Sequence, residues 1–481
     1  MLFPIVNIRR VFKSIFLSLL FLFADKSFAE EFPDTLLRGL DIPLIMISTD
    51  DGVDPQGYRV EHPEGCVGIG LAGNEYKTGR MVMTLLDSTI YDSGEYMPGA
   101  SGIRIKQRGN SSATWNKKPY KLKLSKKYDL FKRGDKKYRS KDWILLSCPK
   151  VDINTLVGFK VSELLGMEWT PEIQYVNIVL NGDYKGLYLL CESVEKSEGR
   201  CDVSENGFII EDDAYWWNEN VYFKGELLPY YMGYTFKYPD ADDVTEEYLS
   251  ALKDYIIEVE EKLSKYEDIS EYLDLKTFAM WLMGHDILGT EDAAGSNRYI
   301  YKNDFIQGNA ASSLLKMGPL WDFDDIYRRE GKWSQQHDGN YRFYFKYLLN
   351  YQEFIDEYVV LWCDIKNTLY NDLMDYLHTF EQDYGETLDI CRELDSKRWH
   401  RSRYNLIADD IRIVDEWMSS RLEWIDEQLM KETFVHVVKE EQSTSSVYTL
   451  DGRQVSSDSE NSVSKLPSGI YIKDGRKFII R

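Results

Sequence analysis

The chain divides into a strand-rich half and a helix-rich half, and this division constrains its fold more than any other feature. Up to about residue 240, short segments alternate apolar and polar residues with the two-residue period of half-buried strands. From about residue 243, apolar residues recur at the spacing of amphipathic helices. We expect an α+β protein, with strands at Ile42–Ser48, Met81–Leu86, Gly102–Gln107, Tyr120–Leu124, Trp143–Ser147, Tyr175–Leu180 and Gly186–Glu192, and helices at Asp152–Leu165 and Leu273–Leu288.

The two ends of the chain differ from this central region. Arg9 and Arg10 precede the apolar run Ile15–Phe23, which is too short to span a bilayer, and Ser27-Phe28-Ala29 offers a cleavage site of the signal-peptide type. We therefore expect export to the periplasm, the cell surface or the medium. The predicted boundaries are a signal peptide at 1–29, a β-rich N-lobe at 30–240, a helical C-lobe at 241–435, a linker at 436–446 and a small β tail at 447–481.

Charge and cysteine usage exclude several classes of function. A net charge of −22 argues against nucleic acid or an anionic membrane as the partner, since both require a basic face. Lys117 to Lys141 is nevertheless dense in lysine, which suits either a polyanion such as a nucleoside triphosphate or a solvated hairpin. The six cysteines lack metal-site spacing, and a Cys191–Cys201 bridge remains open.

Two acidic segments predict a metal site. The apolar strand at Leu315–Met317 runs through Gly-Pro into Asp322 and Asp324, and a second polar segment begins at Asp292 and ends at Asn297. Mg²⁺ binds through one or two carboxylates together with substrate phosphates. An Asp with an Asn five positions later, followed by a strand pair and a metal-type Asp, is the layout of a kinase active site.

Five ordered blocks of sequence resemble the CotH kinases, the family of spore-coat protein H, over roughly residues 40–430. The resemblance implies a two-lobed atypical protein-kinase-like fold, with ATP and Mg²⁺ or Mn²⁺ as cofactors. The chain departs from the family pattern in one helix, where Thr155-Leu-Val-Gly158 stands in place of a sequence with Arg-Asn after the leucine. The blocks are Arg108–Ser112 with Lys117–Leu124, Asp142–Leu146 with Asp152, Tyr175–Glu192, Asp292–Asn297 and Trp321–Asp324.

The same resemblance assigns roles to individual residues. Lys118 would neutralise the α- and β-phosphates, with Lys121 and Lys123 as alternatives, and Glu192 would hold that lysine in a buried ion pair. Asp292 would orient or deprotonate the acceptor hydroxyl; Asp286, in a helical pattern, is a weaker rival that we place at a cap or on the surface. The remaining assignments are a phosphate-covering turn at Arg108, Gly109, Asn110 and Ser111, and metal ligation by Asp322, Asn297 and Asp324.

Transfer of the γ-phosphoryl group of ATP to a hydroxyl of an exported protein is the function that this resemblance implies. Two other classes stay open: a non-catalytic surface or adhesion protein on the same scaffold, and a carbohydrate-active enzyme with Asp292 and Asp322 as paired carboxylates. The aromatic-rich segment from Tyr215 to Tyr238 would then contact a glycan. The final residues, 447–481, resemble the C-terminal sorting tails of exported Bacteroidetes proteins.

Overall fold

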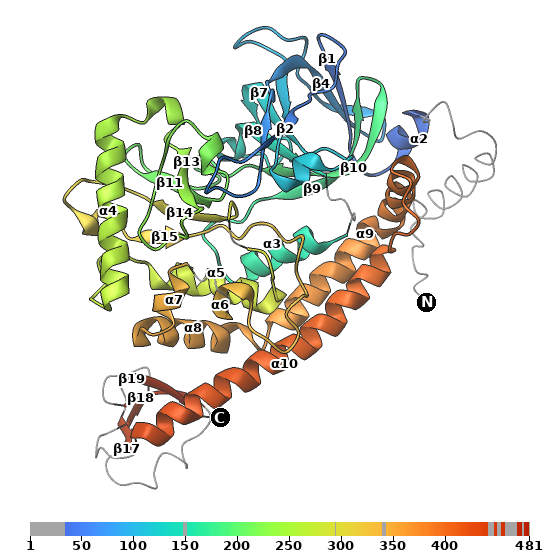
Figure 1. Ribbon diagram of the computed structural model, residues 1–481. Helices are drawn as coiled ribbons and strands as arrows, with labels where there is room; N and C mark the ends of the chain where they lie inside the picture. The colour runs from blue at the N-terminus through green and yellow to red at the C-terminus, as the bar shows by residue number, and fades with distance from the viewer. Residues whose placement is uncertain are drawn as a thin grey trace, which may run out of the picture.

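Seven strands close into a β-barrel in the N-terminal part of the computed structural model (Figure 1). The structure describes residues 34–147, 152–293, 295–338 and 343–440, and four short strands between residues 447 and 480. β1 pairs in parallel with β9 and antiparallel with β4, and these two pairings complete the ring. The barrel strands, in spatial order, are β1 (Leu44–Thr49), β9 (Ile173–Leu180), β10 (Asp183–Glu192), β8 (Ser140–Leu146), β7 (Tyr120–Tyr128), β6 (Ile103–Gln107) and β4 (Lys77–Leu85).

The closed barrel corrects the expected architecture. The α+β class is confirmed, but the two-lobed protein-kinase-like arrangement is wrong. Alternation along a strand shows which side chains are buried, but it does not show whether a late strand returns to pair with the first. Here Leu44 pairs with Asn177, which lies far along the chain. That long-range pairing closes the sheet.

Side chains of the barrel alternate between its interior and its outer wall. The interior holds apolar residues from every strand, including Ile45, Met81, Leu122, Trp143 and Leu190. Their neighbours in sequence point outward, and on one side of the barrel these outward residues are apolar and pack against helices. The outward side chains of β6 and β7 are polar, which leaves a polar outer wall.

A second, five-stranded sheet lies beside the barrel and takes strands from both sides of residue 240. The central strand β11 alternates between two environments: Phe208 and Ile210 belong to the main core, whereas Ile209 packs with Cys201 and Tyr301 in a smaller cluster. The two faces of β11 therefore pack in different surroundings. Its strands, in order, are β12 (Tyr222–Phe223), β13 (Gly233–Tyr238), β11 (Phe208–Asp213), β14 (Arg298–Lys302) and β15 (Leu315–Met317).

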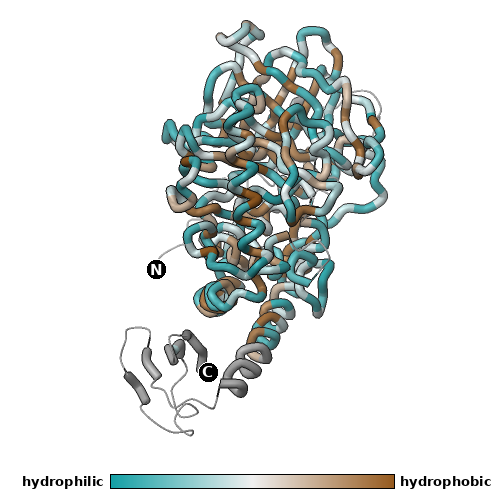
Figure 2. Tube along the Cα trace, turned by 60° about the vertical axis from the view of Figure 1, so that its left-hand side comes forward, coloured by the Kyte–Doolittle hydropathy of each residue, from teal (hydrophilic) through white to brown (hydrophobic). Residues whose placement is uncertain are grey.

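Helices pack below and beside the two sheets. Both predicted helices are present, as α3 (Asn154–Leu164) and the almost fully buried α5 (Leu275–Leu288). Figure 1 shows the long helices α9 (Leu369–Arg398) and α10 (Ile407–Glu440) running side by side, with the end of α9 at the barrel. Figure 2 shows apolar segments inside the body and hydrophilic segments in its outer loops. The other helices are α2 (Asp34–Gly39), α4 (Glu246–Lys265), α6 (Gln335–Asp338), α7 (Phe345–Leu348) and α8 (Gln352–Ile365).

The remaining elements are small. β2 (Tyr58–Glu61) and β3 (Ile69–Ala72) form a hairpin, and β5 (Ser88–Asp92) extends the barrel sheet beyond β4. In the tail, β16 (Val447–Thr449), β17 (Gln454–Ser456), β18 (Gly469–Lys473) and β19 (Arg476–Ile480) form a four-stranded sheet.

The structure bears on some of the predictions about the chain ends and the cysteines. The predicted signal peptide, residues 1–29, lies outside them, and α10 continues to Glu440, inside the predicted linker. None of the helices in the described ranges combines the length and apolar character of a membrane span. The Cys191–Cys201 disulfide that the sequence left undecided is not formed, because both residues are free thiols.

Candidate functional site

Two loops at one end of the second sheet bring the predicted metal ligands together. β14 and β15 are antiparallel neighbours, so the loop entering β14 lies beside the turn leaving β15. Asn297 Nδ2 donates a hydrogen bond of 2.7 Å to Asp322 Oδ2. Asp322 has a φ of 63°, a conformation that non-glycine residues adopt rarely and that is found at functional sites. We call Asp292, Asn297, Asp322 and Asp324 the acidic cluster.

Burial and neighbouring charges both act on Asp322 in the acidic cluster. Burial raises the pKa of Asp322 to about 7, and the charges of Asp324 and Asp292 add to this shift. The hydrogen bond from Asn297 and the charge of Arg108 oppose it. The charges of Asp292, Asp324 and Arg108 therefore all act on Asp322. A cation bound here would remove the repulsion among the carboxylates.

The ligand chemistry of the cluster fits a metal ion that arrives with phosphates. Among the described residues, no group of three or more His, Cys, Asp or Glu side chains is arranged to hold a metal ion by itself. Asp322, with Asn297 and Asp324 beside it, offers the small set of oxygen ligands that Mg²⁺ uses when substrate phosphates complete its shell. These oxygen ligands would fit a cation that substrate phosphates also bind.

Aromatic packing anchors the turn that carries Asp322 and Asp324. The ring of Phe323 lies edge-on to Phe159 of α3, with ring centroids 5.2 Å apart. It also covers Gly158, where an added Cβ would lie only 2.3 Å from the ring. Gly158 is one of the positions at which the helix departs from the family pattern. A larger side chain at this position would collide with the ring of Phe323, so glycine allows the turn to pack against α3.

Asp213, at the end of β11, holds the loop between Asp292 and Asn297 in place through hydrogen bonds. Ser296 Oγ donates a hydrogen bond to Asp213, and Ser296 N donates one of 2.8 Å to the carbonyl oxygen of Asp212. Asp213 also accepts a hydrogen bond of 2.8 Å from the backbone N–H of Tyr215. Ser296 itself has a φ of 94°, so this loop conformation depends on outside contacts.

We expect the Ser296→Ala substitution to lower, by about tenfold or more, the turnover of the phosphoryl transfer that the sequence resemblance implies. The hydroxyl–carboxylate hydrogen bond is worth about 1.5–3 kcal/mol, and its loss would free Asp292 and Asn297 to move. Steady-state kinetics would measure kcat and KM separately. Ser162→Ala is the control, because Ser162 Oγ makes a comparable 2.8 Å contact with Thr170 Oγ1, on the segment that follows α3. An equal effect in both variants would contradict a positioning role for Ser296.

The predicted phosphate-covering turn follows β6 on the outer wall of the barrel. Gly109 has a φ of 92°, and an added Cβ there would lie 2.2 Å from Ser112 Oγ, so the turn requires glycine. Ser111 begins a short 3₁₀ helix, Ser111–Thr114, and Asn110 precedes it. Arg108 is the member of this turn whose charge acts on Asp322.

The lysines predicted to meet phosphate have different environments. Lys121 and Lys123 project from the outer wall toward Asp142, with N–O distances of 3.4 and 3.9 Å. Burial lowers the pKa of Lys106, on the neighbouring strand, and the charge of Lys121 adds to this effect. Lys118 instead donates a 2.8 Å hydrogen bond to the carbonyl oxygen of Ala113. The outer wall is therefore a basic surface on which neighbouring lysines repel one another.

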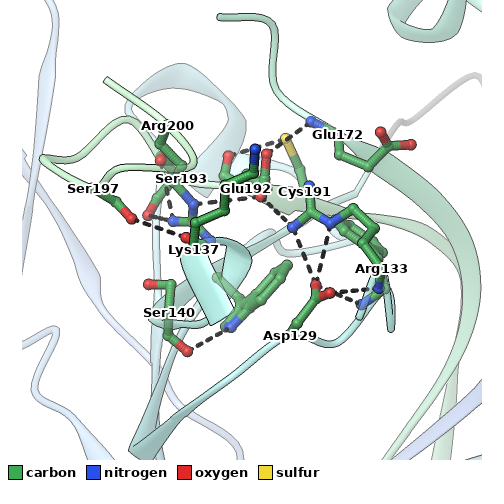
Figure 3. A network of polar contacts seen from close by, with 12 residues as sticks. Asp129, Arg133, Lys137, Ser140, Glu172, Cys191, Glu192, Ser193, Ser197 and Arg200 are labelled. Atoms are coloured by element: carbon green, nitrogen blue, oxygen red, sulfur yellow. Dashed lines mark hydrogen bonds and ion pairs between the residues drawn. The ribbon is translucent and has the colours of Figure 1, made fainter. Parts of the chain in front are cut away.

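The predicted ion pair between Lys118 and Glu192 is wrong. Glu192 is 1% exposed and lies at one end of the barrel, where Arg133 pairs with it at 2.7 Å and Arg200 at 3.6 Å (Figure 3). Its other carboxylate oxygen accepts a 3.1 Å hydrogen bond from Glu172 N. Glu192 alternates with the outward Cys191 and so points inward, whereas Lys121 and Lys123 point outward. The barrel wall therefore separates Glu192 from Lys121 and Lys123.

Sequence reasoning missed three polar residues on the second sheet. Glu211 of β11 pairs with Lys237 of β13 at 2.6 Å and accepts a hydrogen bond from Tyr299 of β14. Burial raises the pKa of Glu211 to about 7, and the charge of Lys237 opposes this shift. The available signal was the pair Glu211 and Asp213, two acids at alternate positions at the end of an apolar strand.

Two other predictions change with the structure. Asp286, expected at a cap or on the surface, is fully buried in α5 and accepts hydrogen bonds of 2.7 Å from Tyr358 and 2.8 Å from Ser334 N. The aromatic segment packs largely inward: Trp217 Nε1 donates a 3.1 Å hydrogen bond to the Val67 carbonyl oxygen of the β2–β3 connection. Tyr230, at 79% exposed, is an exception.

Comparison with protein families places the chain in a known family. Residues 105–425 match the family described as CotH kinase protein, and this match covers well over half of the chain. The chain therefore belongs to the CotH kinase family. No curated protein matches it.

Proposed function

We propose that this protein is a metal-dependent kinase that transfers the γ-phosphoryl group of ATP to a hydroxyl of an exported protein. The observation that carries the proposal is the Asn297–Asp322 hydrogen bond, together with the charges of Asp292, Asp324 and Arg108 that act on Asp322. Phosphoryl transfer is mostly positioning and charge neutralisation, and this arrangement supplies carboxylates for a cation and a guanidinium for phosphate.

Each residue has a defined task in the proposed reaction. Asp322, with Asn297 and Asp324, would hold Mg²⁺ or Mn²⁺, which when bound neutralises charge on the β- and γ-phosphates. Asp292 would accept the proton of the acceptor hydroxyl or orient that hydroxyl for in-line attack. Arg108 and the lysines of the outer wall would bind the phosphate oxygens. The signal peptide and the sorting-like tail, as read from the sequence, support an exported acceptor.

Thermal unfolding of the full chain tests this proposal. We expect Mn²⁺–ATP at 100 times its dissociation constant to stabilise the protein by about 2.7 kcal/mol, while metal alone and ATP alone give much smaller shifts. The ligand-dependent shift should vanish in Asp322→Asn and persist in Asp325→Asn, whose carboxylate pairs with Arg328 at 2.7 Å.

Each outcome of this experiment has a clear meaning. A shift that requires both components and Asp322 would justify a search for the acceptor protein. The absence of any shift in the wild-type protein would overturn the nucleotide site and favour a non-catalytic surface role for the same scaffold.

A further inference from the structure

Lys237 and Glu211 form an ion pair on the second sheet in which the carboxylate is buried and the lysine side chain is partly exposed. The Lys237 Nζ–Glu211 Oε2 distance is 2.6 Å, and the two side chains are 33% and 5% exposed. Glu211 lies opposite Thr235 on β13 and opposite Tyr299 on β14. Its carboxylate is thus held by both neighbouring strands.

The pair lies on the face of the sheet opposite to Phe208 and Ile210 of β11. Phe208 and Ile210 face the main core, so Glu211 and Asp213 project from the opposite face. Asp213 on this face contacts Ser296, directly before Asn297 of the acidic cluster. The pair is therefore joined to the acidic cluster through one strand and one loop.

The charge of Arg108, which follows barrel strand β6, acts on residues of the same face. Burial raises the pKa of Tyr299, and the charge of Arg108 opposes this effect, as it does for Asp322. Arg108 therefore lies within electrostatic range of both Tyr299, which hydrogen-bonds Glu211, and Asp322. The hydrogen bond from Tyr299 to Glu211 links this region to the Glu211–Lys237 pair.

Lys237 suits phosphate better than the lysines predicted from the sequence. Lys118 is hydrogen-bonded to a backbone carbonyl, and Lys121 and Lys123, which are partly exposed, make long contacts with Asp142. By contrast, a buried carboxylate fixes Lys237, and only one of its three ammonium donors is needed for that contact. Such a preorganised cation loses little conformational entropy when it binds an anion.

We propose that Lys237, held in place by Glu211, binds the phosphate groups of the nucleotide in the acidic-cluster site. This inference rests on the proposed kinase function and adds a specific phosphate ligand to it. Lys237 then takes the role that the sequence comparison gave to Lys118, and Glu211 takes the supporting role expected of Glu192.

Lysine reactivity in the wild-type protein tests the contact directly. Reductive methylation of the full chain, with and without saturating Mn²⁺–ATP, would be quantified for each lysine by peptide mass spectrometry. We expect Mn²⁺–ATP to slow modification of Lys237 at least fivefold. Lys196 is the matched control, because it also pairs with a glutamate, Glu205, at 2.6 Å, and its modification rate should not change.

Binding measurements on variants provide the second test. We expect Lys237→Met to raise the Kd for Mn²⁺–ATP by about tenfold to a hundredfold, the value of one charge-assisted hydrogen bond. Glu211→Gln should have a smaller effect, Lys237→Arg should restore part of the affinity, and Lys196→Met should change it less than about twofold. If Lys237→Met does not fold, the protection of Lys237 in the wild-type protein decides.

The outcomes separate this inference from the function on which it rests. Wild-type affinity in Lys237→Met, or unprotected Lys237 in wild-type protein that binds Mn²⁺–ATP, would overturn the role of Lys237 and leave the kinase proposal intact. Failure of the wild-type protein to bind Mn²⁺–ATP would overturn both.

Discussion

Lys117→Met is expected to lower the free energy of unfolding by about 3–5 kcal/mol, the cost of breaking a buried ion pair from one side. Lys117 is 2% exposed, and its ammonium group lies 2.6 Å from Asp395 Oδ1 and 2.5 Å from the Leu187 carbonyl oxygen. Asp395 belongs to α9 and is fully buried, so this contact joins the barrel to the longest helices. Arg401 also pairs with Asp395, at 2.9 Å, which places the expected loss toward the lower end of the range.

Urea denaturation would measure this loss as a lower transition midpoint. Lys397→Met is a matched control on the same helix: Lys397 pairs with Glu393 at 2.6 Å but is half-exposed, so we expect a loss below about 0.5 kcal/mol. A double-mutant cycle with Asp395→Asn should give a coupling free energy of about 1–3 kcal/mol. Additive single effects would show that the two side chains contribute independently.

Asp322→Asn is expected to make the metal-free protein more stable than wild type at pH 8, by about 2–4 kcal/mol. Burial, with the charges of Asp324 and Asp292, raises the pKa of Asp322 in the folded protein to about 7 from an ordinary value of 3.8. The folded state therefore binds a proton that the unfolded state has already released. The stability due to the neutral carboxyl group is complete below about pH 4 and is lost as the pH rises through about 7.

An asparagine amide at this position stays neutral at every pH, so the advantage of Asp322→Asn should grow from about pH 4 and level off above about pH 7. Chemical denaturation in the presence of a chelator, at intervals across this pH range and up to pH 8, would measure it. Asp325→Asn should leave the pH profile unchanged, since Asp325 is outside the acidic cluster. A variant less stable than wild type at pH 8 would show that the carboxylate is already compensated and needs no cation.

The site was predictable where chemistry follows from local sequence. A turn that leaves a strand and a loop that enters its neighbour must lie together once the two strands pair, so Asp292, Asn297 and Asp322 could be grouped from their positions alone. The predicted ion pair of Glu192 was wrong because it does not depend on local sequence. Its partners depend on which side of a barrel wall a side chain occupies, and the sequence pattern contains no information on barrel closure.

Local periodicity determined the seven barrel strands and the helices α3 and α5, because each depends on neighbours a few residues apart. Only the tertiary structure decided that β1 returns to β9, that Lys117 reaches Asp395, and that Lys237 rather than Lys118 meets a buried glutamate. These contacts join segments far apart in the chain. They are selected by the packing of whole sheets and helices, and no local pattern records that packing.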